Sequence, residues 1–248
     1  HGRAPSSISA MLSGIIIQSA LYALLKVCLG TGMPAQVLGT ILIAVSLANM
    51  TLGNTVALTQ IDAKRLLGYS TIAQVGYMLF GIGIGLRYSI PGAIQAGFFL
   101  LVTHGVMKAL AFLSQGVCYF HLKTTTIAKL RGTAFRLPLV AVTFSVALGG
   151  LAGVPPLAGF ISKWFILSEV LQPGEPLAYV GLAVFLLNTL VALGYYLPFT
   201  ARLFTAPDPQ AAPTPERIRI SPWMAVPLVV GGALVMAIGL SPGPWWEW

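Results

Sequence analysis

The sequence contains very little charge. Only 8% of its 248 residues are Asp, Glu, Lys or Arg, and six of them are acidic, whereas a soluble domain carries about 25% charged residues. So few ionisable side chains cannot cover the surface of a globular protein of this size. This excludes an ordinary cytosolic enzyme and a disordered tail. With 56% hydrophobic residues and a mean hydropathy of +0.85, the expected solvent is the lipid bilayer.

Cysteine is also scarce. Cys28 and Cys118 lie in separate apolar segments and have no Cys-x-x-Cys or Cys/His spacing, so neither a zinc site nor an iron–sulfur cluster is indicated. A glycine-rich nucleotide-binding fingerprint followed by an acidic residue is missing as well. We therefore expect no cofactor, no metal and no redox chemistry in the polypeptide itself.

The long apolar runs predict an all-α, polytopic bundle of transmembrane helices. A helix needs about 20 apolar residues to cross the bilayer, and the runs are too long for barrel strands and lack their strict alternation. We place about seven spans, each including its helix ends, near residues 8–29, 34–60, 65–86, 92–118, 137–172, 177–203 and 221–240; Lys26, Arg65 and Arg202 lie at such ends. The chain begins at His1 without an initiator Met, and we interpret this as a start within a connector of a longer membrane protein.

The fifth block is interrupted by Gly153, Pro155 and Pro156, with Gly159 shortly after, so it is either two helices or one broken helix. If it crosses once, ten basic residues lie on one side of the membrane and only Lys26 and Arg87 on the other. The ten are Arg3, Lys64, Arg65, Lys123, Lys129, Arg131, Arg136, Arg202, Arg217 and Arg219. Two crossings would leave seven basic residues on one side of the membrane and five on the other.

The positive-inside rule favours the single crossing by a broken helix, with the start of the chain on the cytoplasmic side and Trp245, Trp246 and Trp248 at the outer interface. A simple proline kink is the alternative. Because the basic residues lie in short connectors and form no continuous basic face, the net charge of +8 does not indicate nucleic-acid binding.

Three basic residues fall within the apolar blocks. A charged lysine at the bilayer centre costs roughly 2.5–3.5 kcal/mol, which favours the neutral amine. Lys163, just after the break, can therefore take up and release a proton there, unless it snorkels to an interface. His104 and Lys108 share one helix face at i, i+4 spacing and suggest a proton relay. Glu169 is either a partner of Lys163 or an interfacial residue.

Three blocks resemble the antiporter-like membrane subunits of respiratory complex I. The opening HGRAPSSISAMLSG is similar to His-x-x-Ala-Pro-x-x-x-Ser-x-x-Leu-Ser-Gly, and residues 62–77, DAKRLLGYSTIAQVGY, are close to Asp-x-Lys-Arg-Leu-Leu-Ala-Tyr-Ser-x-Ile-x-x-x-Gly-Tyr. Residues 151–163, LAGVPPLAGFISK, resemble Leu-x-Gly-x-Pro-x-x-x-Gly-Phe-x-x-Lys.

The resemblance implies fourteen core helices built from two inverted five-helix repeats, of which this chain holds the eighth to the fourteenth. It implies that Lys163 is the central ionisable residue of a broken helix and that His104 and Lys108 form a second basic pair. Gln18 stands where the family usually has a lysine, or a histidine in one branch. The residues expected to take part in proton translocation are Lys163, Lys108, His104, Gln18 and Lys64.

The expected function is proton translocation as a non-redox subunit of an NADH:quinone oxidoreductase-type complex in a prokaryotic cell membrane, with other membrane subunits as partners. One alternative is a subunit of a Mrp-type Na⁺/H⁺ antiporter. The other is a structural membrane subunit that no longer conducts, because Gln18 cannot hold a proton.

Overall fold

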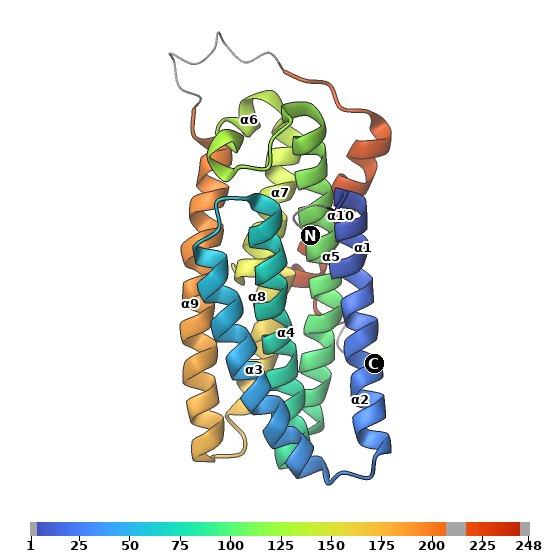
Figure 1. Cartoon of the computed structure of the whole chain (residues 1–248), viewed down its shortest axis with the longest axis vertical. Helices are drawn as coiled ribbons and strands as arrows, with labels where there is room; N and C mark the ends of the chain where they lie inside the picture. Colours follow the sequence, from blue (N-terminus) through green and yellow to red (C-terminus); the bar gives the residue numbers. More distant parts are fainter. Residues whose placement is uncertain (1–3, 207–216, 244–248) are drawn as a thin grey trace.

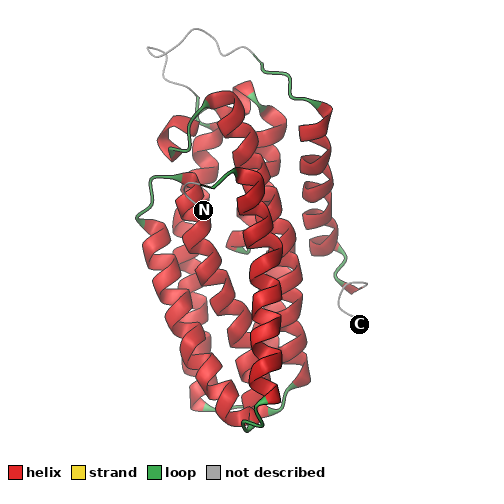
Figure 2. Cartoon of the chain, turned by 45° about the vertical axis from the view of Figure 1, so that its right-hand side comes forward, coloured by secondary structure: helices red, strands yellow, loops and turns green. Residues whose placement is uncertain are grey.

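The chain folds into a bundle of long helices that run along one axis (Figure 1). The structure is a computed structural model that describes residues 4–206 and 217–243. The first three residues of the opening motif, Arg3 among them, and the tryptophans at 245, 246 and 248 lie outside the described residues. The described residues contain no strand, only one isolated bridge between Asp62 and Thr126 (Figure 2). The all-α class is therefore confirmed.

The elements in chain order are α1 (Ser6–Met11), η1 (Leu12–Ile16), α2 (Ile17–Gly30), α3 (Ala35–Leu58), α4 (Ala63–Tyr88), α5 (Pro91–Leu122), η2 (Ile127–Leu130), α6 (Thr133–Arg136), α7 (Pro138–Ala152), α8 (Ala158–Val170), α9 (Pro176–Phe204) and α10 (Pro222–Leu240). Within the described ranges, six helical segments are long and apolar enough to cross a membrane, with α1 to α2 counted as one, and α7 is a shorter apolar helix.

Two predicted blocks are not continuous α-helices. The fifth is divided into α7 and α8, with residues 153–157 between them, so the predicted interruption is present. The first contains a π-helical turn, η1, between α1 and α2, which the sequence analysis did not anticipate. The expected connector near 61–65 is also shorter, because α4 already begins at Ala63 and includes Lys64.

Local sequence explains the helix ends. Proline occupies the first position of α5, α7, α9 and α10. Its lack of an N–H costs nothing there, because a backbone N–H at this position has no hydrogen-bond partner within the helix. Asp62 caps α4, and its Oδ1 accepts a hydrogen bond from the Arg65 N–H at 3.0 Å. At their C-terminal ends, α4 and α5 stop at residues in the left-handed conformation, Ser89 and Lys123.

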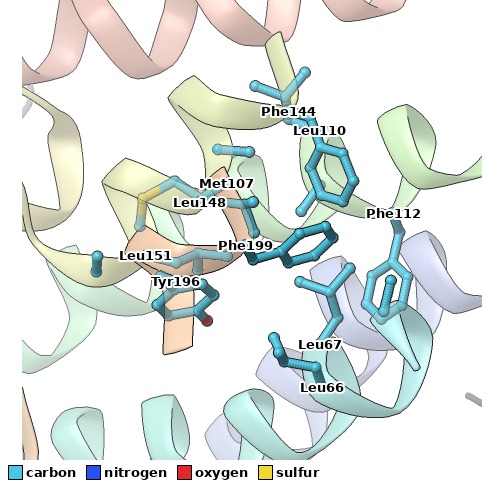
Figure 3. Close-up of a cluster of buried hydrophobic side chains, with 14 of the residues drawn as sticks. Leu66, Leu67, Met107, Leu110, Phe112, Phe144, Leu148, Leu151, Tyr196 and Phe199 are labelled. Atoms are coloured by element: carbon cyan, nitrogen blue, oxygen red, sulfur yellow. The ribbon is translucent and has the colours of Figure 1, made fainter. Parts of the chain in front are cut away.

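The helices α4 and α5 form the centre of the bundle. In the most apolar 18-residue window of each helix, 78% of α4 and 61% of α5 are buried, against 28–33% for the first span, α3, α9 and α10. The peripheral helices turn large apolar side chains outward, among them Leu187, Leu190 and Val226, as a lipid-facing surface requires. The interior contains a large apolar cluster in which Leu67, Phe112, Phe144 and Phe199 meet (Figure 3).

The basic connectors meet at one end of the bundle. The Ala63 N–H donates to the Thr125 carbonyl at 2.8 Å, which joins the start of α4 to the loop after α5. Backbone hydrogen bonds also join Gly132 to Arg202 and Ile218 to Arg136. Most of the predicted basic-rich side is therefore one physical end of the molecule.

We predict that Asp62→Ala lowers the free energy of unfolding by about 1–2 kcal/mol, since it removes the α4 cap together with the hydrogen bond that the Thr125 hydroxyl donates to Asp62. Thermal unfolding in detergent, followed by helical circular dichroism, measures the loss. Ser221→Ala is the matched control, because Ser221 precedes α10 without making a side-chain cap. An equal loss in both variants would contradict the assigned role of Asp62.

Candidate functional site

The break between α7 and α8 supplies hydrogen-bond acceptors inside the bundle. An α-helix ends with four carbonyls that have no partner within the helix. Here the Leu151 carbonyl accepts from the Gln74 side chain at 2.8 Å and from Lys163 Nζ at 3.5 Å, and the Ala152 carbonyl accepts from Lys163 Nζ at 3.3 Å. The interrupted helix therefore holds the buried amine through its own free end.

The predicted break residues shape this turn. Gly153 has φ +88°, a left-handed conformation that favours glycine, and a Cβ there would lie 3.2 Å from the Lys163 side chain. Pro155 and Pro156 form the exposed part of the turn. Gly159, the second residue of α8, lies so close to α7 that a Cβ on it would collide with the Gly150 carbonyl oxygen.

Lys163 is buried, with 4% of its surface exposed. Besides the two carbonyls, its ammonium faces the ring of Tyr77, 4.5 Å from the ring centroid. This is the geometry of a cation–π contact, which stabilises a desolvated cation by up to about 2 kcal/mol. Lys163 does not snorkel to an interface, and no carboxylate of the described residues pairs with it.

Glu169 is not the partner of Lys163. Its carboxylate lies against Gly92 at the start of α5 and accepts a hydrogen bond from Gln172 at 2.7 Å. This is a favourable position for an anion, because the N-terminal end of a helix carries partial positive charge. The Glu169 carboxylate therefore belongs to the N-terminal end of α5 and not to Lys163.

Lys108 is completely buried in the middle of α5. Its Nζ donates to the Leu67 carbonyl at 2.7 Å and to the Ser70 hydroxyl at 2.6 Å, both on α4. An ammonium group has three N–H groups, so two neutral acceptors leave one of its donors for another partner. Lys108 is thus a second buried amine without a carboxylate.

His104 lies one turn before Lys108 on α5 and is also fully buried. Its Nδ1 is 3.2 Å from Nε2 of Gln18, on the first span. Its Nε2 has no hydrogen-bond partner within the described part of the chain. The structure therefore places Gln18 beside His104, one helical turn from Lys108.

The π turn explains why Gln18 faces inward. Buried positions of the first span are Ser9, Ala10, Ser13, Gln18, Leu21 and Leu25; the spacing is three or four residues up to Ser13, five from Ser13 to Gln18, and three or four after Gln18. A plain α-helix would put residue 17 on the inner face. The additional residue in η1 turns Gln18 there instead.

Helix α4 connects the two lysines. Ser70, Gln74 and Tyr77 are spaced i, i+4, i+7 and therefore share one face; they contact Lys108, the Leu151 carbonyl and Lys163 in turn. A second link, 2.8 Å long, joins the hydroxyls of Thr103 on α5 and Ser162 on α8. We call Gln18, His104, Lys108, Ser70, Gln74, Tyr77 and Lys163 the polar row.

The contacts of Ser70, Gln74 and Tyr77 were not anticipated from the sequence. The signal was present, because three polar residues recur on one face of an apolar helix. Beyond Tyr77, a buried network continues the polar contacts: Asn54 donates to the Tyr77 hydroxyl at 3.1 Å and accepts from Tyr195 at 2.9 Å.

Lys64 lies outside the polar row. Its Nζ donates to the Ala4 carbonyl at 2.8 Å and faces the ring of Tyr119 at 5.4 Å. It lines a groove of about 770 Å³ at the end of the bundle, together with Ser6 and Lys123. The structure thus places Lys64 in this groove at the end of the bundle, apart from the other four residues predicted to take part in proton translocation.

Known proteins resemble this chain over most of its length. The family model described as "NADH:quinone oxidoreductase/Mrp antiporter, TM" matches residues 1–196. NADH-quinone oxidoreductase subunit N of Moorella thermoacetica is 30% identical over 244 residues, which cover 97% of this chain and 49% of that protein. The chain spans about half the length of the curated relatives it matches.

Solved structures share the fold. A chain of respiratory complex I from Thermus thermophilus with bound aureothin has a TM-score of 0.67 and 32% identity, covering 82% of this chain and 44% of that one. A chain of the Mrp complex from Dietzia sp. DQ12-45-1b has a TM-score of 0.80 at 24% identity, covering 98% and 52%. The matched family model and these similarities show that the chain belongs to the NADH:quinone oxidoreductase/Mrp antiporter transmembrane family.

Proposed function

We propose that this chain moves protons across the membrane as part of a subunit of an NADH:quinone oxidoreductase-type complex, driven by electron transport elsewhere in that complex. The observation that carries the proposal is the burial of Lys163, Lys108 and His104 with only neutral partners. Buried ionisable groups are costly inside a membrane protein and commonly belong to ion paths and proton relays.

The chemistry of the polar row suits proton exchange. Each lysine can be neutral or charged, because its neutral acceptors do not demand one state as a carboxylate would. When one amine gains a proton, its charge repels a proton on the next. The hydroxyls of Ser70, Thr103 and Ser162 both donate and accept, so they can pass a proton between the amines.

The orientation follows from the basic end of the bundle. Because cytoplasmic loops are enriched in Lys and Arg, we propose that this end, with Lys64 and the connectors after α5 and α9, faces the cytoplasm of a prokaryotic cell. Other membrane subunits of a respiratory-type complex are the proposed partners, as in the relatives named above.

We predict that Lys163→Ala and Lys163→Arg each lower proton pumping roughly tenfold or more, the scale of losing a proton-transfer group. Arginine keeps the charge but does not release its proton, so it separates proton exchange from a need for positive charge. The measurement is NADH-driven acidification of membrane vesicles that contain the assembled complex.

The matched control is Lys129→Ala, which removes an exposed lysine from the connector after α5 and should leave pumping at the native level. Complex content and the rate of NADH oxidation are measured in every sample. Normal pumping by Lys163→Arg would contradict proton exchange at this amine. If both Lys163 variants pumped normally, yet the complex failed to assemble without the chain, a structural role would replace the proposal.

The Mrp-type reading is tested separately with the same protein in proteoliposomes. A Na⁺/H⁺ exchanger requires that proton flux depend on sodium, whereas a redox-driven pump does not. Proton flux that follows an imposed sodium gradient without any redox substrate would favour the antiporter.

We predict that Tyr77→Leu lowers pumping by up to roughly thirtyfold, because it removes a cation–π contact of up to about 2 kcal/mol from the desolvated Lys163 ammonium. Tyr77→Phe retains the ring and should lose less. The same vesicle assay measures both variants. An equal loss in both would assign the effect to the Tyr77 hydroxyl and its hydrogen bond with Asn54, and would contradict the role of the ring.

A further inference from the structure

The contact between Gln18 and His104 defines the protonation of the imidazole ring. Nε2 of Gln18 lies 3.4 Å from the Leu101 carbonyl and 3.2 Å from Nδ1 of His104. A carbonyl oxygen only accepts hydrogen bonds, so the amide atom that faces it is the NH₂ group and not the oxygen. The same nitrogen faces Nδ1.

An amide NH₂ group only donates, and therefore Nδ1 must be the acceptor and carry no proton. A neutral imidazole has one N–H, which is then on Nε2. We propose that Gln18 is a positioning residue that holds His104 in the Nε2–H tautomer. This departure from a lysine at position 18 gives the first span a fixed hydrogen-bond donor in place of a titratable group.

The fixed tautomer sets the direction in which His104 presents its proton. Nε2 makes no hydrogen bond within the described residues, so its N–H is free to donate to a water molecule. Lys108, one turn away on the same face of α5, is the nearest titratable group along this helix. The Nδ1 side is closed by the Gln18 amide and the Leu101 carbonyl.

A second proton on His104 requires Gln18 to move. A doubly protonated imidazole has an N–H at both nitrogens, and an N–H on Nδ1 would point at the NH₂ group of Gln18. Half a turn of the amide would bring Oε1 to Nδ1, but it would also bring Oε1 toward the Leu101 oxygen. Protonation of His104 is therefore coupled to rotation of one side chain, a consequence that rests on the proposed function.

Lys108 is the charged neighbour of His104, and a cation there opposes a second proton on the ring. Gln18 is the polar side chain of the first span that touches the ring. On α8, Ser162 binds Thr103, and Lys163 faces the α7 carbonyls and Tyr77; on α4, Ser70 binds Lys108. Gly105 leaves space for the Gln18 amide, because a Cβ at that position would lie 3.2 Å from the amide nitrogen.

The test is ¹⁵N solid-state NMR of the full chain in lipid bilayers at neutral pH, with histidine labelled at both ring nitrogens. The chemical shift separates bare from protonated nitrogens, and loss of the signals in His104→Asn assigns them. The native protein is expected to show a bare Nδ1 and a protonated Nε2 at His104. A protonated Nδ1 would overturn the proposal without any variant.

Gln18→Glu has nearly the same shape but offers an acceptor, so it should transfer the proton to Nδ1. Gln18→Leu removes the donor and should give a mixture of tautomers. Gln115→Glu is the matched control, since this buried α5 amide accepts from Ser6 and does not touch His104, whose signals should stay native.

An unchanged bare Nδ1 in both Gln18 variants would also overturn the proposal. If Gln18→Glu does not fold, Gln18→Leu and the native spectrum still decide. The NMR result does not depend on pumping. If Nδ1 of His104 is bare but the Lys163 variants pump normally, only the proposed function is rejected. If Nδ1 is protonated but the Lys163 variants lose pumping, only the assignment of Gln18 is rejected.

Discussion

An amine buried in a membrane protein without a carboxylate must take its hydrogen-bond acceptors from neutral groups, and this requirement organises the bundle. In a regular helix each carbonyl already bonds the N–H four residues on, which leaves only its second lone pair for a further donor. The break after Ala152 frees carbonyls at that depth, and Lys163 uses two of them. Lys108 meets the same need with the Ser70 hydroxyl and the Leu67 carbonyl. Neutral acceptors leave each amine able to change charge, which a buried ion pair would oppose.

The central place of α4 follows from the same requirement. Its polar face meets both lysines, while its remaining surface packs against apolar side chains such as Phe185 and Phe199. Glycines on both helices allow α4 to approach α3 closely. A Cβ on Gly53 of α3 or on Gly76 of α4 would meet backbone atoms of the other helix within 3 Å. The peripheral helices need only an apolar outer surface, and they therefore expose leucine and valine to lipid.

Much of this architecture could be predicted from the sequence. Length and hydropathy indicate the helices, and the Gly-Pro-Pro cluster indicates the break, because both signals are local. The pairing of His104 with Lys108 follows from helical spacing alone. The contacts between helices do not, since the position of Tyr77 beside Lys163 depends on how α4 and α8 pack. Glu169 shows the same limit: two turns after Lys163 along α8, its carboxylate lies instead at the start of α5. The π turn escaped prediction because one additional residue hardly changes the apolar content of a span.

That turn also determines how the first span responds to changes in length. Ser13 and Gln18 share the buried face at a spacing of five residues, one more than an ordinary α-helical turn needs. Loss of a single residue between them would convert the π turn into α-helix and keep both side chains inside. Loss of a residue after Gln18 would instead rotate Leu21 and Leu25 by about 100°, away from the interior. The first span should therefore accept shortening at one place along its length and resist it farther along.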